Sequence, residues 1–242
     1  RWNPKMKKYI FGKRDSIHII DLTQTIELIN EALEKVYSTI TNGGKILFIS
    51  TKKQASESIA ELAKNTNQYF VNHRWLGGML TNWGTISNSI KKLNKINLDL
   101  SSENRGFTKK ELLKMSGQKD KLQKSLGGIT DMKKLPNLVF IIDTNYESLA
   151  IKESIKLRIP IIAILDTNSN PEGVDFPIPG NDDARRSIDL YCDLLKETIF
   201  NAIKDIPDEV EKKEVNKKLN DVKIENNSLT ITPEKSSDKK II

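Results

Sequence analysis

Two aspartates occupy positions where a parallel α/β protein places metal ligands or catalytic groups. Asp143 and Asp166 each directly follow an apolar run that is typical of a strand, and each is followed by Thr-Asn. The carboxyl ends of parallel strands meet at one edge of a sheet, so this pair is a candidate Mg²⁺ site for a nucleotide-dependent enzyme. The competing interpretation, which we favour, is that each Asp-Thr-Asn caps a helix or closes a turn.

The sequence lacks the other features that such an enzyme needs. Neither G-x-G-x-x-G nor G-x-x-x-x-G-K-[ST] occurs in it. The loop 51–54, Thr-Lys-Lys-Gln, has no glycine, although its amides and Lys52 could bind a single phosphate. His18 and Cys192 have no recognisable catalytic partners, and one cysteine builds neither an internal disulfide nor a structural zinc site. We therefore predict no enzymatic activity, no cofactor and no metal site.

Cations interleaved with aromatic rings favour a different chemistry. They gather in segment 70–83, FVNHRWLGGMLTNW, and in the first nine residues, RWNPKMKKY. Aromatic and arginine side chains beside glycine suit stacking on nucleic-acid bases and contacts to phosphates. Alternatively, Trp75 and Trp83 are core anchors, and both interpretations can hold, with Arg74 facing the nucleic acid. The first nine residues show no helical period and predict an extended arm.

The positive charge is concentrated in two stretches. The chain has a net charge of +7, from 39 basic and 32 acidic residues. Residues 1–14 contain six basic and no acidic side chains, and residues 85–135 contain 12 basic and 5 acidic ones. The rest of the chain is mildly acidic, so the two stretches indicate a polyanionic partner. The alternative is a lysine-rich composition without a binding role.

Apolar runs alternate with helical patterns along most of the chain. The predicted strands are Ile17–Asp21, Lys45–Ser50, Tyr69–Val71, Leu138–Asp143, Pro160–Leu165 and Val174–Ile178, and the predicted helices are Thr23–Ile40, Gln54–Lys64, Tyr146–Leu157 and Asp182–Lys204. Thr23 or Thr25 is the expected cap of the first helix. Nearly continuous apolar strands between helices predict a parallel sheet covered on both faces, a three-layer α/β/α fold of doubly wound order.

Residues 84–130 interrupt this alternation with two narrow apolar seams. The seam positions are Ile86, Ile90, Leu93, Asn97 and Leu100, then Leu112, Met115, Lys119, Leu122 and Leu126. A polar turn at Ser101–Gly106 separates them, and Thr108 is the expected cap of the second helix. This pattern predicts an antiparallel coiled-coil hairpin that projects from the sheet. Its outer positions carry Lys91, Lys92, Lys95, Lys109, Lys110, Lys114, Lys121 and Lys124.

Composition excludes several classes of protein. Hydrophobic residues make up 37% of the 242 residues and charged residues 29%. The longest apolar runs, such as Ile159–Leu165, are much shorter than the ~20 residues of a membrane-spanning helix. The single cysteine fits a reducing compartment, and no signal-peptide core is visible. Because the chain does not begin with methionine, we expect residues to precede Arg1. The polar stretch after Asp205 predicts a partly disordered tail.

Four stretches carry a close resemblance to a known family. They are residues 1–22, 70–83, 125–143 and 166–188, and they occur in family order. The sequence resembles the bacterial-type small-subunit ribosomal protein S2 family (uS2). The resemblance implies a flavodoxin-like domain with an inserted helical hairpin, located where the head of the small subunit meets its body. It also implies contact with small-subunit ribosomal RNA and with neighbouring ribosomal proteins, and a part in recruiting the large RNA-binding protein S1.

We accordingly expect a structural, ribonucleoprotein role in translation, in the cytoplasm, with an organellar origin left open. The expected parts are a basic arm and first strand (1–22), a globular domain (23–83 and 131–204), a coiled-coil hairpin (84–130) and a tail (205–242). The expected RNA-binding residues are Arg1, Trp2, Lys5, Lys7, Lys8, Lys13, Arg14, His73, Arg74, Trp75, Asn82, Trp83, Lys91, Lys92, Lys95, Lys109, Lys110 and Lys114. Arg185 and Arg186 are weaker candidates that could instead pair with Asp182 and Asp183. The alternatives from other classes are the Mg²⁺- or nucleotide-dependent enzyme and a protein-binding adaptor.

Overall fold

A computed structural model describes residues 2–101 and 106–205. Arg1, most of the turn predicted at Ser101–Gly106 and the tail predicted beyond Asp205 lie outside the described residues. No helix within the two described ranges is both long enough and apolar enough to cross a membrane.

Five parallel strands form the central sheet. They are β3 (Ile46–Ile49), β4 (Tyr69–Val71), β5 (Leu138–Ile142), β6 (Ile161–Leu165) and β7 (Phe176–Pro179), arranged in the order β4-β3-β5-β6-β7. Phe48 pairs in register with Phe140, and Phe140 with Ile162. Counted along the chain, the order is 2-1-3-4-5, which is the flavodoxin-like arrangement with its switch point between β3 and β5. The predicted α/β class and parallel sheet are confirmed.

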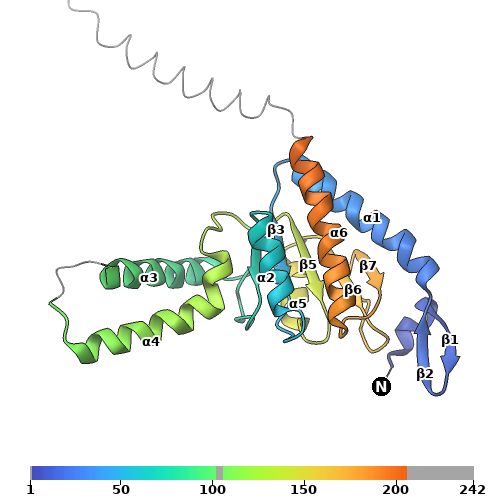
Figure 1. Ribbon diagram of the computed structural model, residues 1–242, viewed down its shortest axis with the longest axis horizontal. Coiled ribbons are helices and arrows are strands. Elements are labelled where there is room, and N and C mark those ends of the chain that lie inside the picture. The colour runs from blue at the N-terminus through green and yellow to red at the C-terminus, as the bar shows by residue number, and fades with distance from the viewer. Residues whose placement is uncertain (1, 102–105, 206–242) are drawn as a thin grey trace, which may run out of the picture. The chain divides into compact units, whose positions relative to one another are not determined.

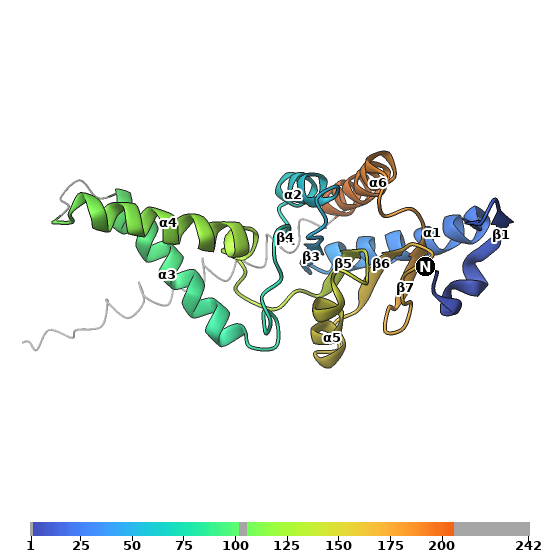
Figure 2. The same cartoon turned by 90° about the horizontal axis from the view of Figure 1, so that it is seen from below.

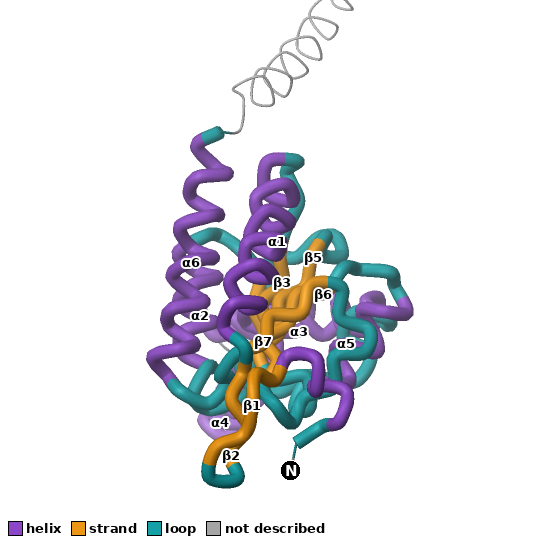
Figure 3. The backbone as a smooth tube through the Cα atoms, turned by 90° about the vertical axis from the view of Figure 1, so that its right-hand side faces the viewer, coloured by secondary structure: helices purple, strands orange, loops and turns teal. Residues whose placement is uncertain are grey.

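Helices cover both faces of this sheet (Figure 3). On one face lie α1 (Leu22–Thr41), α2 (Ser56–Asn65) and α6 (Arg185–Lys204), packed against alternate strand residues that include Phe48 and Phe140. On the other face lie α5 (Ser148–Lys156) and the non-helical segment 75–80, packed against Leu47 and Ile49. Successive strand residues point to opposite faces of the sheet, and both faces are covered. All residues of β3, β5 and β6 are therefore buried.

Several helix ends differ from the prediction because loop side chains cap them. The cap of α1 is Asp21, whose carboxylate accepts from the Thr23 amide at 3.1 Å, so the expectation of Thr23 or Thr25 was wrong. The Thr25 hydroxyl instead donates to the Pro179 carbonyl at 2.7 Å and ties α1 to β7. Helix α6 begins at Arg185 rather than Asp182, because the Asn181 side chain accepts from the amides that precede the helix.

The N-terminal segment is folded, so the prediction of an extended arm was wrong. A 3-10 helix, η1, spans Pro4–Tyr9, and β1 (Ile10–Arg14) pairs antiparallel with β2 (Ile17–Ile20) outside the main sheet. Asn3 caps η1 by accepting from the Lys5 amide at 3.1 Å, and Pro4 supplies the fixed φ of a first helical residue. Met6 is buried against the core of the globular part. The burial of Met6 outweighs the weak local preference of this cationic sequence for an extended conformation.

Two adjacent helices extend away from the sheet beyond β4 (Figures 1 and 2). They are α3 (Trp83–Ser101) and α4 (Lys109–Leu126), and α4 continues into a 3-10 turn, η2 (Gly127–Ile129). Thr108 and Glu111 form a capping box at the start of α4, as the Thr108 position predicts. The buried positions of α3 are Ile86, Ile90, Leu93 and Ile96, and Asn97 is half-buried.

Candidate nucleic-acid interface

The two projecting helices present a cationic surface. Its members, which we call the hairpin lysines, are Lys91, Lys92, Lys95, Lys109, Lys110, Lys114, Lys121 and Lys124, and all eight are exposed. Within residues 2–101 and 106–205, none of them forms an ion pair with an acidic side chain. Their charge is therefore directed at solvent, which is the arrangement that phosphate neutralisation requires.

At the base of this hairpin, one tryptophan is buried, whereas the polar side chains next to it in the sequence are exposed. Trp75 is only 7% exposed, and its Nε1 donates to Glu153 Oε1 at 3.0 Å. Trp75 is therefore a core anchor and has no ring face free for stacking on a base. Trp83 is partly buried against the same core. His73 and Arg74 remain exposed, so they are the candidate contacts that this segment offers.

Glu153 organises the base of the hairpin, and sequence reasoning missed it. Its Oε1 accepts from Trp75 Nε1 and from the Gly78 amide at 2.8 Å, and its Oε2 accepts from the Leu80 amide and from the amide and hydroxyl of Thr81 at 3.0 to 3.1 Å. Burial acts to raise the pKa of Glu153, but these hydrogen bonds together outweigh it, so the pKa is lowered. Gly78 adopts a φ of +83°, which glycine allows without strain.

Asn82 and Gly128 fix the two ends of the hairpin. The Asn82 side chain accepts from the Thr85 hydroxyl at 3.0 Å at the start of α3. At the end of α4, Gly128 packs directly on β4, where a Cβ at this position would collide with the Phe70 carbonyl oxygen. A larger residue at Gly128 would therefore push η2 away from β4.

The cationic residues of the N-terminal segment form a second surface. Lys7, Lys8, Lys13 and Arg14 are exposed, whereas Lys5 pairs with Glu172 at 2.6 Å. Trp2 stacks on His18 with ring centroids 4.9 Å apart, which gives that histidine a structural role. The Asn3 amide donates to the Thr167 carbonyl after β6, and α1 bonds to β7. This surface thus lies near the β7 edge, and the hairpin lies beyond β4 at the opposite edge (Figure 1).

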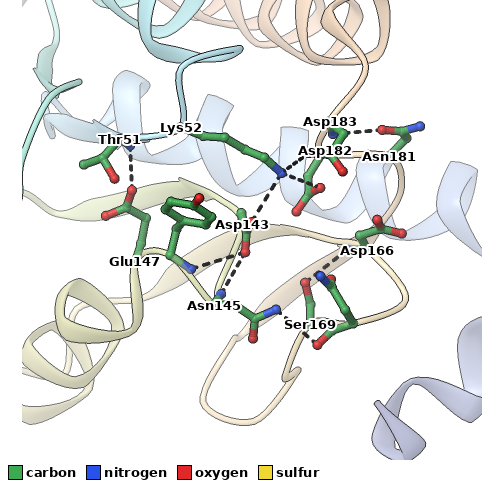
Figure 4. Close-up of polar contacts among 12 residues, drawn as sticks. Thr51, Lys52, Asp143, Asn145, Glu147, Asp166, Ser169, Asn181, Asp182 and Asp183 are labelled. Atoms are coloured by element: carbon green, nitrogen blue, oxygen red, sulfur yellow. Dashed lines mark hydrogen bonds and ion pairs between the residues drawn. The ribbon is translucent and has the colours of Figure 1, made fainter. Parts of the chain in front are cut away.

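Of the two strand-end aspartates, Asp143 belongs to a salt-bridge network around Lys52 (Figure 4), whereas Asp166 accepts from the Thr167 amide at 2.6 Å. Lys52 Nζ lies 3.3 Å from Asp143 Oδ2, 2.9 Å from Asp182 Oδ1 and 2.5 Å from Asp183 Oδ1. Asp143 Oδ1 accepts from the Asn145 amide at 2.9 Å, so the capping interpretation fits this residue. Lys52 is buried and held by carboxylates, and it is not free to bind a phosphate.

Burial and charge perturb the acidic groups of this network. Burial raises the pKa of Asp182 to about 6, the charges of Asp143 and Asp166 add to this effect, and Lys52 opposes it. Burial also raises the pKa of Glu147, which accepts from the Thr51 amide at 2.6 Å. The expectation that Arg185 could pair with Asp182 and Asp183 was wrong. Arg185 reaches Glu57 at 3.1 Å and Asp189 at 3.9 Å, because the two aspartates face Lys52.

Comparison with known proteins gives a consistent result. The family model described as Ribosomal protein S2 matches residues 1–202. The small ribosomal subunit protein uS2 of Phenylobacterium zucineum is 59% identical over 203 residues, which cover 84% of this chain and 69% of the relative. Its counterparts in Bartonella quintana and Rickettsia rickettsii are 57% and 56% identical. The matches cover 84% and 85% of this chain and 79% and 70% of those relatives.

Proposed function

The chain belongs to the ribosomal protein S2 family, and from this membership we propose that it binds small-subunit ribosomal RNA and neighbouring ribosomal proteins as a structural constituent of the small subunit, in the cytoplasm. The family consists of ribosomal proteins and not of enzymes, so the alternative of a Mg²⁺- or nucleotide-dependent enzyme is not supported.

The hairpin lysines are the observation that carries the proposal. Eight ammonium groups on two adjacent helices stay exposed and unpaired within the described residues, so RNA phosphates can neutralise them. Each neutralised phosphate releases condensed counterions, and this release drives association. Lys7, Lys8, Lys13, Arg14, His73 and Arg74 complete the proposed contact set. The hairpin and the N-terminal segment lie at opposite sheet edges, and we infer that they contact separate RNA segments.

Sedimentation with small subunits tests this proposal. Subunits stripped of their own S2 protein should carry the chain into the pellet at one copy per subunit. Intact subunits, in which the position is already filled, are the control and should leave added chain in the supernatant. Equal recovery from stripped and intact subunits would contradict the proposal, because it would indicate nonspecific binding.

A protein contact is proposed for the apolar surface of the N-terminal segment. Phe11 and Ile17 of this segment, and Leu22 and Ile26 at the start of α1, lie within 16 consecutive residues and are all more than 60% exposed. Contiguous exposed apolar surface marks interaction sites. We assign to this surface the contact with neighbouring proteins, including the recruitment of protein S1 that the sequence resemblance implies.

Serine substitutions test this apolar contact. The double variant Phe11→Ser and Ile17→Ser should reduce the S1 recovered with reconstituted subunits by at least about tenfold, since each buried apolar side chain contributes ~1.5–3 kcal/mol. Leu113→Ser, at a comparably exposed site on α4, is the matched control and should leave S1 recovery unchanged. Equal S1 recovery with both variants would remove this surface from the contact.

A further inference from the structure

A cavity of about 500 Å³ lies at the base of the hairpin, next to the hairpin lysines. Its walls come from the second half of α2, from β4 with the residues that follow it, and from the turn in which α4 continues into η2. Pockets that bind small organic ligands typically measure roughly 300 to 1,000 Å³. The cavity is therefore large enough for a ligand of about the size of one nucleotide, and too small for an RNA double helix.

Hydrogen bonds and close packing within the fold hold the walls of this cavity. The Asn72 side chain donates to the Ser56 carbonyl at 3.1 Å, and the Ser56 hydroxyl donates to the Asn72 carbonyl at 2.8 Å. The Gln68 side chain accepts from the Ile46 amide at 2.9 Å. On the opposite wall, Gly128 packs directly on β4. The cavity is thus formed without a ligand, which lowers the entropy cost of binding one.

The lining of the cavity offers groups that recognise a nucleobase. Tyr69 contributes a half-buried ring, and Asn67 and Gln123 contribute exposed side-chain amides. Burial and the charge of Asp131 raise the pKa of Tyr69, so its hydroxyl stays protonated at neutral pH and can donate. Aromatic rings stack on bases, and side-chain amides both donate to and accept from base edges. This combination suits a base that has left its own stack.

The charge of the lining favours an anionic group beside that base. Lys64 and Lys124 are exposed, and neither forms an ion pair within residues 2–101 and 106–205. Among the described residues that line the cavity, Asp131 is the one carboxylate. A phosphate would offset the remaining positive charge. Lys124 belongs to the hairpin lysines and His73 to the proposed contact set, so the cavity is continuous with the proposed RNA surface.

We propose that this cavity binds one unpaired nucleotide of the RNA, with its base against Tyr69 and Gln123 and its phosphate beside Lys64 or Lys124. The inference rests on the proposed RNA-binding function and adds to it a contact that recognises a nucleotide rather than backbone charge alone. Side chains cannot read base edges in the deep, narrow major groove of an RNA helix, so proteins recognise bases in loops, bulges and ends. A cavity of this size likewise admits a base only when that base is extruded from the helix.

Paired and bulged RNA stems test this inference. Five labelled stems share one sequence: one is fully paired, and four carry a single extra A, C, G or U. Fluorescence anisotropy at one KCl concentration gives their affinities for the protein. We expect the best bulged stem to bind at least about fivefold more tightly than the paired stem, because stacking of one base contributes roughly five- to 150-fold. Equal affinities for all five stems would overturn the inference and leave the proposed function intact, whereas no binding to any stem would overturn both.

A neutral substitution assigns the preference for a bulge to the cavity. Gln123 is exposed, so Gln123→Leu should leave the fold and the salt dependence of binding unchanged. It should weaken binding of the preferred bulged stem roughly two- to twelvefold, the contribution of one hydrogen bond, and leave binding of the paired stem unchanged. Gln118→Leu is the matched control, because Gln118 is exposed on the same helix and does not line the cavity. Equal bulge preferences for the two variants would overturn the inference.

Discussion

Replacing Lys91, Lys92 and Lys95 by alanine should weaken RNA binding and make its salt dependence shallower. Each lost phosphate contact lowers the slope of log affinity against log salt by roughly 0.7 to 0.9, so the triple variant should lose about two to three units of slope. These lysines share one exposed side of α3 and have no acidic partner within the described ranges. Fluorescence anisotropy of a labelled small-subunit RNA fragment, measured across a range of KCl concentrations, gives both quantities.

A second triple variant controls for net charge. Lys53, Lys152 and Lys156 are exposed on the globular part, outside α3 and α4. Their replacement by alanine removes the same charge and should leave the slope nearly unchanged. If the hairpin variant keeps the wild-type slope, or if both variants lose the same amount, α3 does not form part of the RNA-binding surface.

Glu153→Gln should destabilise the protein by about 2 to 4 kcal/mol. Glutamine preserves the size of the side chain, but its NH₂ group donates hydrogen bonds and cannot accept them. The amide donors that bond to one carboxylate oxygen of Glu153 would therefore lose their acceptor. The carboxylate receives five hydrogen bonds from the segment between β4 and α3, so this one residue holds the base of the hairpin. Urea unfolding of the wild type and of this variant gives the difference in the free energy of unfolding.

The difference in the free energy of unfolding between the wild type and Glu153→Gln should depend on pH, which supplies an internal check. The pKa of Glu153 is lowered in the folded state, so its contribution is complete above the unfolded value, near 4.5, and is lost as pH falls through the folded value. The wild-type advantage over Glu153→Gln should be largest at neutral pH and shrink below about pH 4. Glu57→Gln, which affects only the exposed pair with Arg185, should cost less than about 1 kcal/mol. Equal costs for the two variants would contradict the role of Glu153.

The sheet could be predicted because its pattern is local. Strands such as Leu138–Ile142 are uninterrupted apolar runs, and a strand buried on both faces requires such a run. The capping box of Thr108 and Glu111 is likewise visible within four residues. The 3-10 helix Pro4–Tyr9 was missed because the burial of Met6 and Tyr9 depends on distant partners, although Asn3 and Pro4 are a local signal for its start.

The candidate interface likewise has features that a local pattern predicts and features that depend on distant residues. The exposure of the hairpin lysines follows from their spacing along the two helices, and that spacing is visible in the sequence itself. The anchoring of Trp75 depends on Glu153, which lies 78 positions later in the chain. The network around Lys52 joins residues that are 91 and 130 positions apart, and its members stand in loops without periodicity. Contacts between residues so far apart in the sequence can be predicted only from the three-dimensional arrangement of the strands.

Directed hydroxyl-radical cleavage of RNA from the hairpin tests the central claim most directly. Burial raises the pKa of the Cys192 thiol to about 12, so an iron chelate should label only a cysteine introduced at an exposed site. Asn94→Cys places that chelate among the α3 lysines, and Glu31→Cys places it on exposed α1 of the globular part. On reconstituted small subunits, we predict strong cleavage of ribosomal RNA from position 94 and weak cleavage from position 31. Cleavage from position 31 alone would contradict the claim that the hairpin faces RNA.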